Sequence, residues 1–177
     1  MKVGIVFPDG FEEIEGLAVV DILRRGQADV TMIGLTDSTV SSAQKIQVIM
    51  DATVESVNFD DFDMIVMPGG AGAENYLPCE KLKNAIAAFL GNNNKFVGAI
   101  CAAPNILGRW GLLNHRSVTV YPTIEVAGAD IRRQKVVVDG NLITGAGPGA
   151  SMEFGYALLS KMADEETVKI LKEKMIV

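Results

Sequence analysis

One cysteine of the chain follows a short apolar segment in the stretch KFVGAICAAPNILGRWG, residues 95–111. Ala99 and Ala103 flank Cys101, and a sharp strand-to-helix turn that carries a nucleophile needs such small neighbours. Pro104 suits the first turn of a helix, because its missing N–H needs no partner there. The pattern predicts a thiol at a helix N-terminus, where the helix dipole and free N–H groups favour the reactive thiolate. Cysteine is also among the most buried residue types, so a purely structural Cys101 is the alternative.

Acidic residues near the start of the chain offer a proton partner for this thiol. Histidine is the usual partner, but the sequence has only His115, which we place in a surface connection away from the site. Glu12, Glu13 and Glu15 lie around the start of the first predicted helix, and acidic side chains also stabilise a helix N-terminus without any catalytic role. Glu13 lies on a mixed helix face. Glu15 shares its face, at helical spacing, with Ala18, Val19, Ile22 and Leu23.

The buried stripe predicted for Glu15 has a chemical consequence. A carboxyl group that loses its hydration has its pKa raised. Glu15 could then stay protonated, donate a hydrogen bond to the Cys101 thiolate and move protons near neutral pH. Two interacting groups of this kind titrate as a coupled pair.

Two glycines follow another apolar segment in MPGGAGAEN, residues 67–75. The spacing is not that of a phosphate-binding P-loop, and the loop has no lysine. Glycine lets a backbone N–H approach a reacting group closely. Gly70 N–H and Ala102 N–H would therefore form a two-donor oxyanion site facing the sulfur, and the alternative is a simple turn. The second cysteine, Cys79, precedes a helical pattern without such a corner, and we interpret it as incidental.

The segments that must position these residues alternate between short β-branched runs and longer helical patterns. Alternation of this kind predicts βαβ units and a parallel sheet covered by helices on both faces. Ligands gather beyond the carboxyl ends of such strands, and the loops with Glu15, Gly70 and Cys101 all leave strands at that edge. We expect strands within 2–7, 29–35, 63–70 and 95–100, and helices within 14–26, 79–92, 103–111, 149–162 and 164–175. Residues 117–144 differ, since two β-runs surround an Asp139–Gly140 turn, and predict a small antiparallel addition.

The composition limits the function classes. With 177 residues, 49% of them hydrophobic, the chain is expected to form one domain with a full core. The net charge is −6, so nucleic acid is not expected as the main partner. No apolar run approaches the roughly 18 residues of a transmembrane helix, and the opening MKVGIVFPDGFEE is typical of a strand rather than a signal peptide. Two cysteines and one histidine supply a metal site poorly, and we expect a cytoplasmic protein without disulfide or membrane contact.

Five motifs along nearly the whole chain resemble one family: GFEEIE, DILRRG, MPGG, AICAAP and GPGASMEF. The sequence resembles the ThiJ/PfpI superfamily, most closely the branch of the Parkinsonism-associated protein deglycase and bacterial ThiJ/YajL-type proteins. The resemblance implies a single class I glutamine amidotransferase-like domain over residues 1–177. Its fold would be a flavodoxin-like three-layer α/β sandwich with a mainly parallel sheet, and it would form homodimers.

The same resemblance assigns roles to individual residues. Cys101 matches the easily oxidised nucleophile, Glu15 the glutamate that hydrogen-bonds to it, and Gly70 with Ala102 the backbone donors. Arg25 falls on an arginine near the family's active-site entrance. Tyr121 stands where some members carry a histidine before a proline, and tyrosine is a poor base at neutral pH. A hydrolytic Cys–His triad is therefore not expected here.

These residues lead to two hypotheses of different classes. The first is a stress-protective glyoxalase or deglycase that acts on methylglyoxal, a small reactive carbonyl, or on its adducts, and needs no cofactor. The second is a redox sensor or redox-controlled chaperone, in which Cys101 is oxidised to a sulfinic acid held by Glu15. Both use the same residues.

Overall fold

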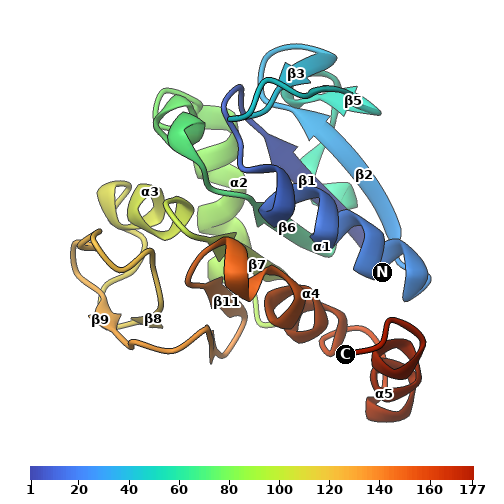
Figure 1. The fold of residues 1–177 in the computed structure, drawn as a ribbon. Helices are drawn as coiled ribbons and strands as arrows, with labels where there is room; N and C mark the ends of the chain where they lie inside the picture. The colour runs from blue at the N-terminus through green and yellow to red at the C-terminus, as the bar shows by residue number, and fades with distance from the viewer.

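A seven-stranded sheet forms the centre of the computed structural model, which describes residues 1–177. Its strands are β1 (Lys2–Phe7), β2 (Asp29–Gly34), β5 (Ala52–Thr53), β6 (Met64–Met67), β7 (Phe96–Ile100), β10 (Val136–Asp139) and β11 (Leu142–Gly145). They lie in the order β10-β11-β7-β6-β1-β2-β5 (Figure 1). All neighbours pair in parallel except β10 and β11. The mainly parallel sheet predicted from the alternating pattern is confirmed.

Helices cover both faces of this sheet. The helices are α1 (Glu13–Arg25), α2 (Glu80–Leu90), α3 (Ala103–Arg109), α4 (Ser151–Leu159) and α5 (Glu165–Lys174). Residues of α1, α4 and α5 share one apolar cluster with the sheet, and residues of α2 and α3 share the other. Along β1 the side chains alternate between the clusters, with Ile5 and Phe7 in the first and Val6 in the second. The result is the three-layer α/β sandwich expected for the fold class.

The hairpin around Gly140 is present, but its two strands differ in role. β10 is antiparallel to β11, and Gly140 has a φ of 58° in the turn between them. β11 itself pairs in parallel with β7, with Thr144 opposite Ala99. Only β10 is therefore an antiparallel addition, because β11 continues the parallel sheet and ends next to the cysteine corner.

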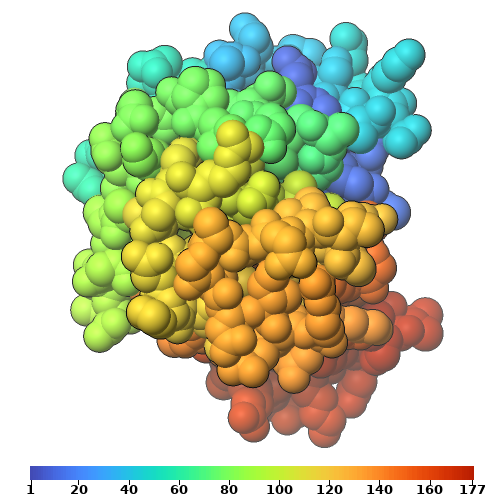
Figure 2. All heavy atoms as spheres, turned by 90° about the vertical axis from the view of Figure 1, so that its left-hand side faces the viewer, coloured from blue at the N-terminus to red at the C-terminus, as the bar shows by residue number.

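Two short two-stranded sheets lie outside the central one. β3 (Thr39–Ser41) and β4 (Gln47–Ile49) are antiparallel, while β8 (Ser117–Val118) and β9 (Asp130–Ile131) are parallel. The segment between α3 and β10, coloured yellow to orange, spreads over the middle of the side drawn in Figure 2. Four 3-10 segments complete the structure: Val54–Ser56, Phe59–Asp61, Ala71–Tyr76 and Pro148–Ala150. No helix has the length and apolar character that crossing a membrane would require.

Candidate active site

Cys101 lies at the corner between β7 and α3. Its φ is 63°, a left-handed value that is uncommon outside glycine and often marks functional sites. Hydrogen bonds hold this corner on both sides, because Cys101 N–H donates to Gly145 O at 2.9 Å and Cys101 O accepts from Tyr121 N–H at 3.1 Å. The residue is only 8% exposed. Helix α3 starts two residues later, after its N-cap Ala102, so the predicted strand-to-helix corner is present.

Glu15 reaches this corner from the first turn of α1. It is 1% exposed, which confirms the buried stripe predicted from the helical spacing. One carboxylate oxygen, Oε2, accepts a hydrogen bond from Gly69 N–H at 2.9 Å. The other, Oε1, is buried without a partner of ordinary hydrogen-bond geometry, and the carboxyl group interacts with the Cys101 thiol. The adjacent Glu12 caps the helix by accepting from Glu15 N–H at 2.8 Å.

The glycine pair after β6 brings backbone donors to both groups. Gly69 N–H bonds to Glu15, whereas Gly70 N–H and Ala102 N–H both lower the pKa of Cys101 as donors to its sulfur. Side chains do not fit at this turn. Gly70 has a φ of 103°, and a Cβ on Gly69 would lie 2.8 Å from Ala102 N. The structure therefore brings together the four residues that the sequence singled out for the site, Cys101 and Glu15 with Gly70 and Ala102.

Burial dominates the electrostatics of this pair. Loss of hydration raises the pKa of Glu15 to about 7, against the opposing hydrogen bonds from Cys101 and Gly69. Burial also raises the pKa of the Cys101 thiol to about 12, and the negative charge of Glu15 contributes in the same direction. The backbone N–H groups of Gly70 and Ala102 lower the pKa of this thiol, as expected for a helix N-terminus, but burial is the larger cause. Protonation of Glu15 removes its repulsion of the thiolate, so the two groups share protons as one unit.

Glu13 points away from the thiol and binds the loop between β3 and β4 instead. Its carboxylate accepts hydrogen bonds from Ser42 Oγ at 2.5 Å and from Gln44 N–H at 2.6 Å. These bonds lower the pKa of Glu13, with Ser42 as the largest cause. Glu13 thus attaches the β3–β4 hairpin to the start of α1, and the separation of Glu13 from Glu15 by helical face is confirmed.

Comparison with known proteins identifies the family. Residues 1–161 match the DJ-1/PfpI family. The chain belongs to this family. Protein dj-1beta of Drosophila melanogaster is 31% identical over 178 residues, which cover 98% of this chain and 95% of the fly protein. The protein DJ-1 homolog B of Arabidopsis thaliana is 36% identical over 163 residues, which cover 89% of this chain but only 37% of the plant protein.

Solved structures of this family have the same fold. Schizosaccharomyces pombe DJ-1 superposes with a TM-score of 0.93 over 100% of both chains at 25% identity. Toxoplasma gondii DJ-1, described as oxidized, superposes with a TM-score of 0.90 at 26% identity and covers 99% of this chain and 97% of its own. The flavodoxin-like architecture expected from the resemblance is therefore shown.

Tyr121, the departure from the histidine of some DJ-1/PfpI members, borders the cysteine corner. Its backbone N–H holds Cys101 O, while its side chain is 43% exposed. The ring lies against Gly147, and with Lys135 and Pro148 it lines a groove of about 320 Å³. The structure places Tyr121 next to the site, where its backbone rather than its hydroxyl contacts Cys101.

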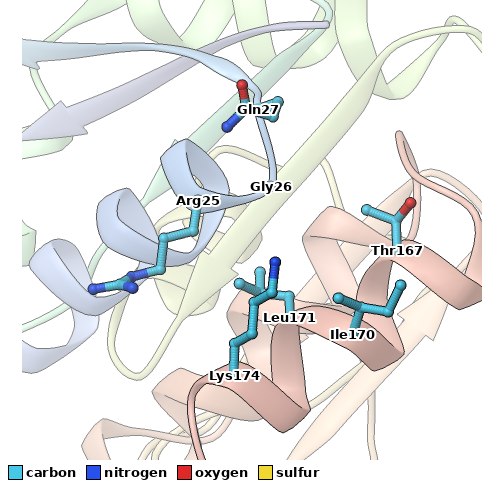
Figure 3. A pocket seen from close by; sticks show the side chains of 7 residues that line it. All are labelled: Arg25, Gly26, Gln27, Thr167, Ile170, Leu171 and Lys174. Carbon is cyan, nitrogen blue, oxygen red and sulfur yellow. The ribbon is translucent and has the colours of Figure 1, made fainter.

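Arg25 occupies the opposite end of α1 from Glu15. Ten residues separate the two along the helix, which corresponds to roughly 15 Å at the helical rise. Arg25 pairs with Asp21 at 2.8 Å and lines a surface pocket of about 470 Å³ between α1 and α5 (Figure 3). Within one chain, Arg25 therefore lies at the end of α1 next to α5, and its expected position near the active-site entrance stays a prediction.

His115 and Cys79, which were not assigned to the site from the sequence, lie away from the Cys101 corner. His115 is exposed, with a φ of 61°, in the connection before β8. Cys79 is the N-cap residue of α2 and is half-buried. No group of three or more His, Cys, Asp or Glu side chains is arranged to hold a metal ion.

One contributor to the site was missed in the sequence. Gly69 N–H is a donor to Glu15, although only the second glycine of the pair was predicted as a donor. The signal was available, because two consecutive glycines after a strand leave two backbone N–H groups free to approach reacting groups.

Proposed function

We propose that the chain is a cofactor-independent glyoxalase or deglycase that uses Cys101 as its nucleophile. The observation that carries the proposal is the buried Glu15 carboxyl group beside a thiol that also receives two backbone N–H donors. Relatives support the same chemistry. A glutathione-independent glyoxalase of Caenorhabditis elegans is 29% identical over 93% of this chain and 90% of its own length. A deglycase of Pyrococcus abyssi is 33% identical over 84% of this chain and 92% of its own.

The first step on methylglyoxal is addition of the thiol to the aldehyde. Glu15 in its ionised form takes the thiol proton, and the sulfur of Cys101 forms a bond to the aldehyde carbon. The carbonyl oxygen becomes an oxyanion, which Gly70 N–H and Ala102 N–H stabilise. Protonation of this oxygen gives a hemithioacetal on Cys101.

The second step is a proton transfer within the bound adduct. Glu15 removes the hydrogen from the former aldehyde carbon, which gives an enediol, and returns a proton to the neighbouring carbon. The first carbon is thereby oxidised and the second reduced, so no external oxidant or reductant is needed. Water then cleaves the resulting thioester, releasing lactate and the free thiol.

Two variants test this function in fresh, fully reduced protein. Cys101→Ser should abolish lactate formation from methylglyoxal, while Cys79→Ser should turn over like the parent. Reaction in D2O should place deuterium on the hydroxyl-bearing carbon of lactate, because solvent protons exchange through Glu15. If the Cys101→Ser variant turns over methylglyoxal at the parental rate, the proposal is wrong.

A redox sensor or redox-controlled chaperone is the second candidate. It is favoured by the similarity to a Toxoplasma gondii structure described as oxidized. The N–H groups of Gly70 and Ala102, together with protonated Glu15, would support the oxygens of a Cys101 sulfinate. Selective oxidation of Cys101 without methylglyoxal turnover would favour this candidate, and mass spectrometry alongside the turnover assay distinguishes the two.

We also propose that the chain acts in the cytoplasm as a homodimer with a role in stress protection. A reducing compartment would keep the oxidisable Cys101 in its active form. Exposed apolar side chains support a dimer that uses the first helix, because Ile14 on α1 is 55% exposed and Ile49 on the β3–β4 hairpin is 76% exposed. Sedimentation at micromolar concentration should give a dimer, and a monomer would contradict the assembly.

A further inference from the structure

The two peptide groups of the Pro68–Gly69–Gly70 turn point their N–H groups at the reacting pair. Gly69 N–H donates to Glu15 Oε2 at 2.9 Å, and Gly70 N–H lowers the pKa of the Cys101 thiol. In a trans peptide the N–H and C=O groups point in opposite directions. A hydrogen bond that fixes the C=O of a planar peptide therefore also fixes the direction of the N–H on its opposite side.

Each carbonyl has one such partner. Gly69 O, in the peptide that carries Gly70 N–H, accepts from Glu12 N–H at 3.0 Å. Pro68 O, in the peptide that carries Gly69 N–H, accepts from the Tyr76 hydroxyl at 3.0 Å. No backbone N–H donates to Pro68 O. The first peptide is thus held by the backbone and the second by a single side chain.

Tyr76 is well placed for this task. It ends the 3-10 segment Ala71–Tyr76, is 0% exposed, and packs among residues of α2 and α3 on the face opposite α1. The same hydroxyl donates to Val6 O near the end of β1 at 2.7 Å, so one bifurcated O–H joins the ends of two neighbouring strands. A fully buried ring with a fixed hydroxyl holds a defined position, because neither water nor side-chain motion competes for the bond.

We propose that Tyr76 is a positioning residue for the Glu15–Cys101 pair. Its hydroxyl fixes the Pro68–Gly69 peptide so that Gly69 N–H stays aimed at the Glu15 carboxylate. The hydrogen bond at the carbonyl also polarises the peptide and strengthens its N–H as a donor. This inference rests on the proposed function only where it concerns turnover, because the effect on the titration of Glu15 is independent of any substrate.

Few charged or titratable groups face Glu15, which makes its titration a clean readout. Cys101 faces it from the β7–α3 corner, Glu12 from the loop before α1, and Tyr76 from the 3-10 segment. Glu13 on the same helix is bonded to Ser42 instead. Tyr76→Phe removes a hydroxyl and leaves all the charges in place.

The test compares Tyr76→Phe with the matched control Tyr156→Phe. Tyr156 is a buried tyrosine whose hydroxyl contacts Met175 Sδ at 3.3 Å, in the α4–α5 region away from the site. The amide proton resonance of Gly69 in ¹⁵N-labelled protein reports the titration of Glu15 directly. Tyr76→Phe should move its midpoint up by about 0.5–1 in pH, because a weaker donor stabilises the carboxylate less. Tyr156→Phe should leave the midpoint unchanged, and an unchanged midpoint in Tyr76→Phe would overturn the proposal.

A second substitution at position 76 should shift the Gly69 midpoint in the opposite direction. It also tests the proposal if the Tyr76→Phe protein does not fold. 3-Fluorotyrosine at position 76 keeps the ring and makes the phenol a stronger donor, so the Gly69 midpoint should move down. A midpoint that does not move down contradicts the proposal.

In turnover, Tyr76→Phe should lower kcat several-fold at unchanged KM. If the parent does not turn over methylglyoxal, the proposed function fails, while the Gly69 titration still decides the role of Tyr76.

Discussion

The two cysteines lie in similar positions next to helices, and their surroundings differ. Cys79 is the N-cap of α2, which has 11 residues, whereas Cys101 precedes α3, which has only seven. A helix dipole acting alone would favour Cys79, because the longer helix has the more fully developed dipole. Only Cys101 has a buried carboxyl partner and N–H donors from a second loop. Converging loops, rather than a helix N-terminus by itself, therefore distinguish the proposed nucleophile from the second cysteine.

Serine substitution of each cysteine in turn should give the largest difference in methylglyoxal turnover between the two positions. Cys101→Ser should lower methylglyoxal turnover by more than about 1,000-fold, because removal of a nucleophile removes the whole covalent route. Cys79→Ser should stay within about twofold of the parent, since Cys79 has no partner in the proposed reaction. Steady-state lactate production measures both. A large loss in Cys79→Ser with intact folding would show that the second cysteine is not incidental.

Replacement of Glu15 should separate enzyme chemistry from oxidation of the same thiol. Glu15→Gln and Glu15→Leu should each lower turnover by about 100- to 1,000-fold, because neither side chain can accept and return a proton. Gln can still donate a hydrogen bond to a sulfinate, and Leu cannot. Mass spectrometry after peroxide treatment should therefore find Cys101 sulfinate in the Gln variant and much less in the Leu variant. Parental turnover by Glu15→Gln would transfer the acid–base role to another group, with Tyr121 as the next candidate.

The buried Glu15 carboxyl group should lower the free energy of unfolding at high pH, where it is ionised. Its pKa is raised from an unfolded value near 4.5 to about 7, so the folded state binds the proton more tightly. Stability from this proton is complete below about pH 4.5 and is lost as the pH rises through 7. Glu15→Gln should therefore raise the unfolding free energy at pH 8 by about 1–3 kcal/mol and leave it nearly unchanged at pH 4.5. Urea denaturation at both pH values measures this, and a destabilised Gln variant at pH 8 would contradict burial as the dominant cause.

Tyr121→Phe should have the smallest effect. The ring lines the groove beside the corner, but no hydrogen bond from its hydroxyl reaches Cys101 or Glu15. Removal of a bystander hydroxyl should lower turnover by less than about tenfold, or roughly 1.4 kcal/mol in the barrier. Kinetics with methylglyoxal give the value. A larger loss would mean that Tyr121 takes over a task of the histidine found in some relatives.

Sequence patterns predicted the parts of this structure that depend on periodicity. The helical spacing placed Glu15 on the buried face, and the alternation of strands and helices predicted the sheet edge where Cys101 and Gly70 meet. The pairing of β11 with β7 was not predicted, because a hairpin turn fixes its two strands but not their neighbours.

The remaining features depend on three-dimensional packing. The hydrogen bond from Tyr76 to Pro68 O joins a buried aromatic residue to a carbonyl, and no local pattern signals such a contact. The raised pKa of Cys101 follows from burial, which competes with the helix dipole by an amount that spacing does not give. Arg25 was placed by resemblance alone, and its position on α1 directs it to the other end of the helix.

The most direct test measures the alkylation rate of both cysteines in the same tube from pH 5 to 10, by peptide mass spectrometry of reduced protein. If Glu15 accepts the thiol proton, the rate at Cys101 should rise through about pH 7 as Glu15 ionises, and Cys79 should show no inflection there. Glu15→Gln should remove that inflection from Cys101 and leave the Cys79 profile unchanged. An inflection near pH 7 that persists at Cys101 in Glu15→Gln would contradict a proton shared between Glu15 and Cys101.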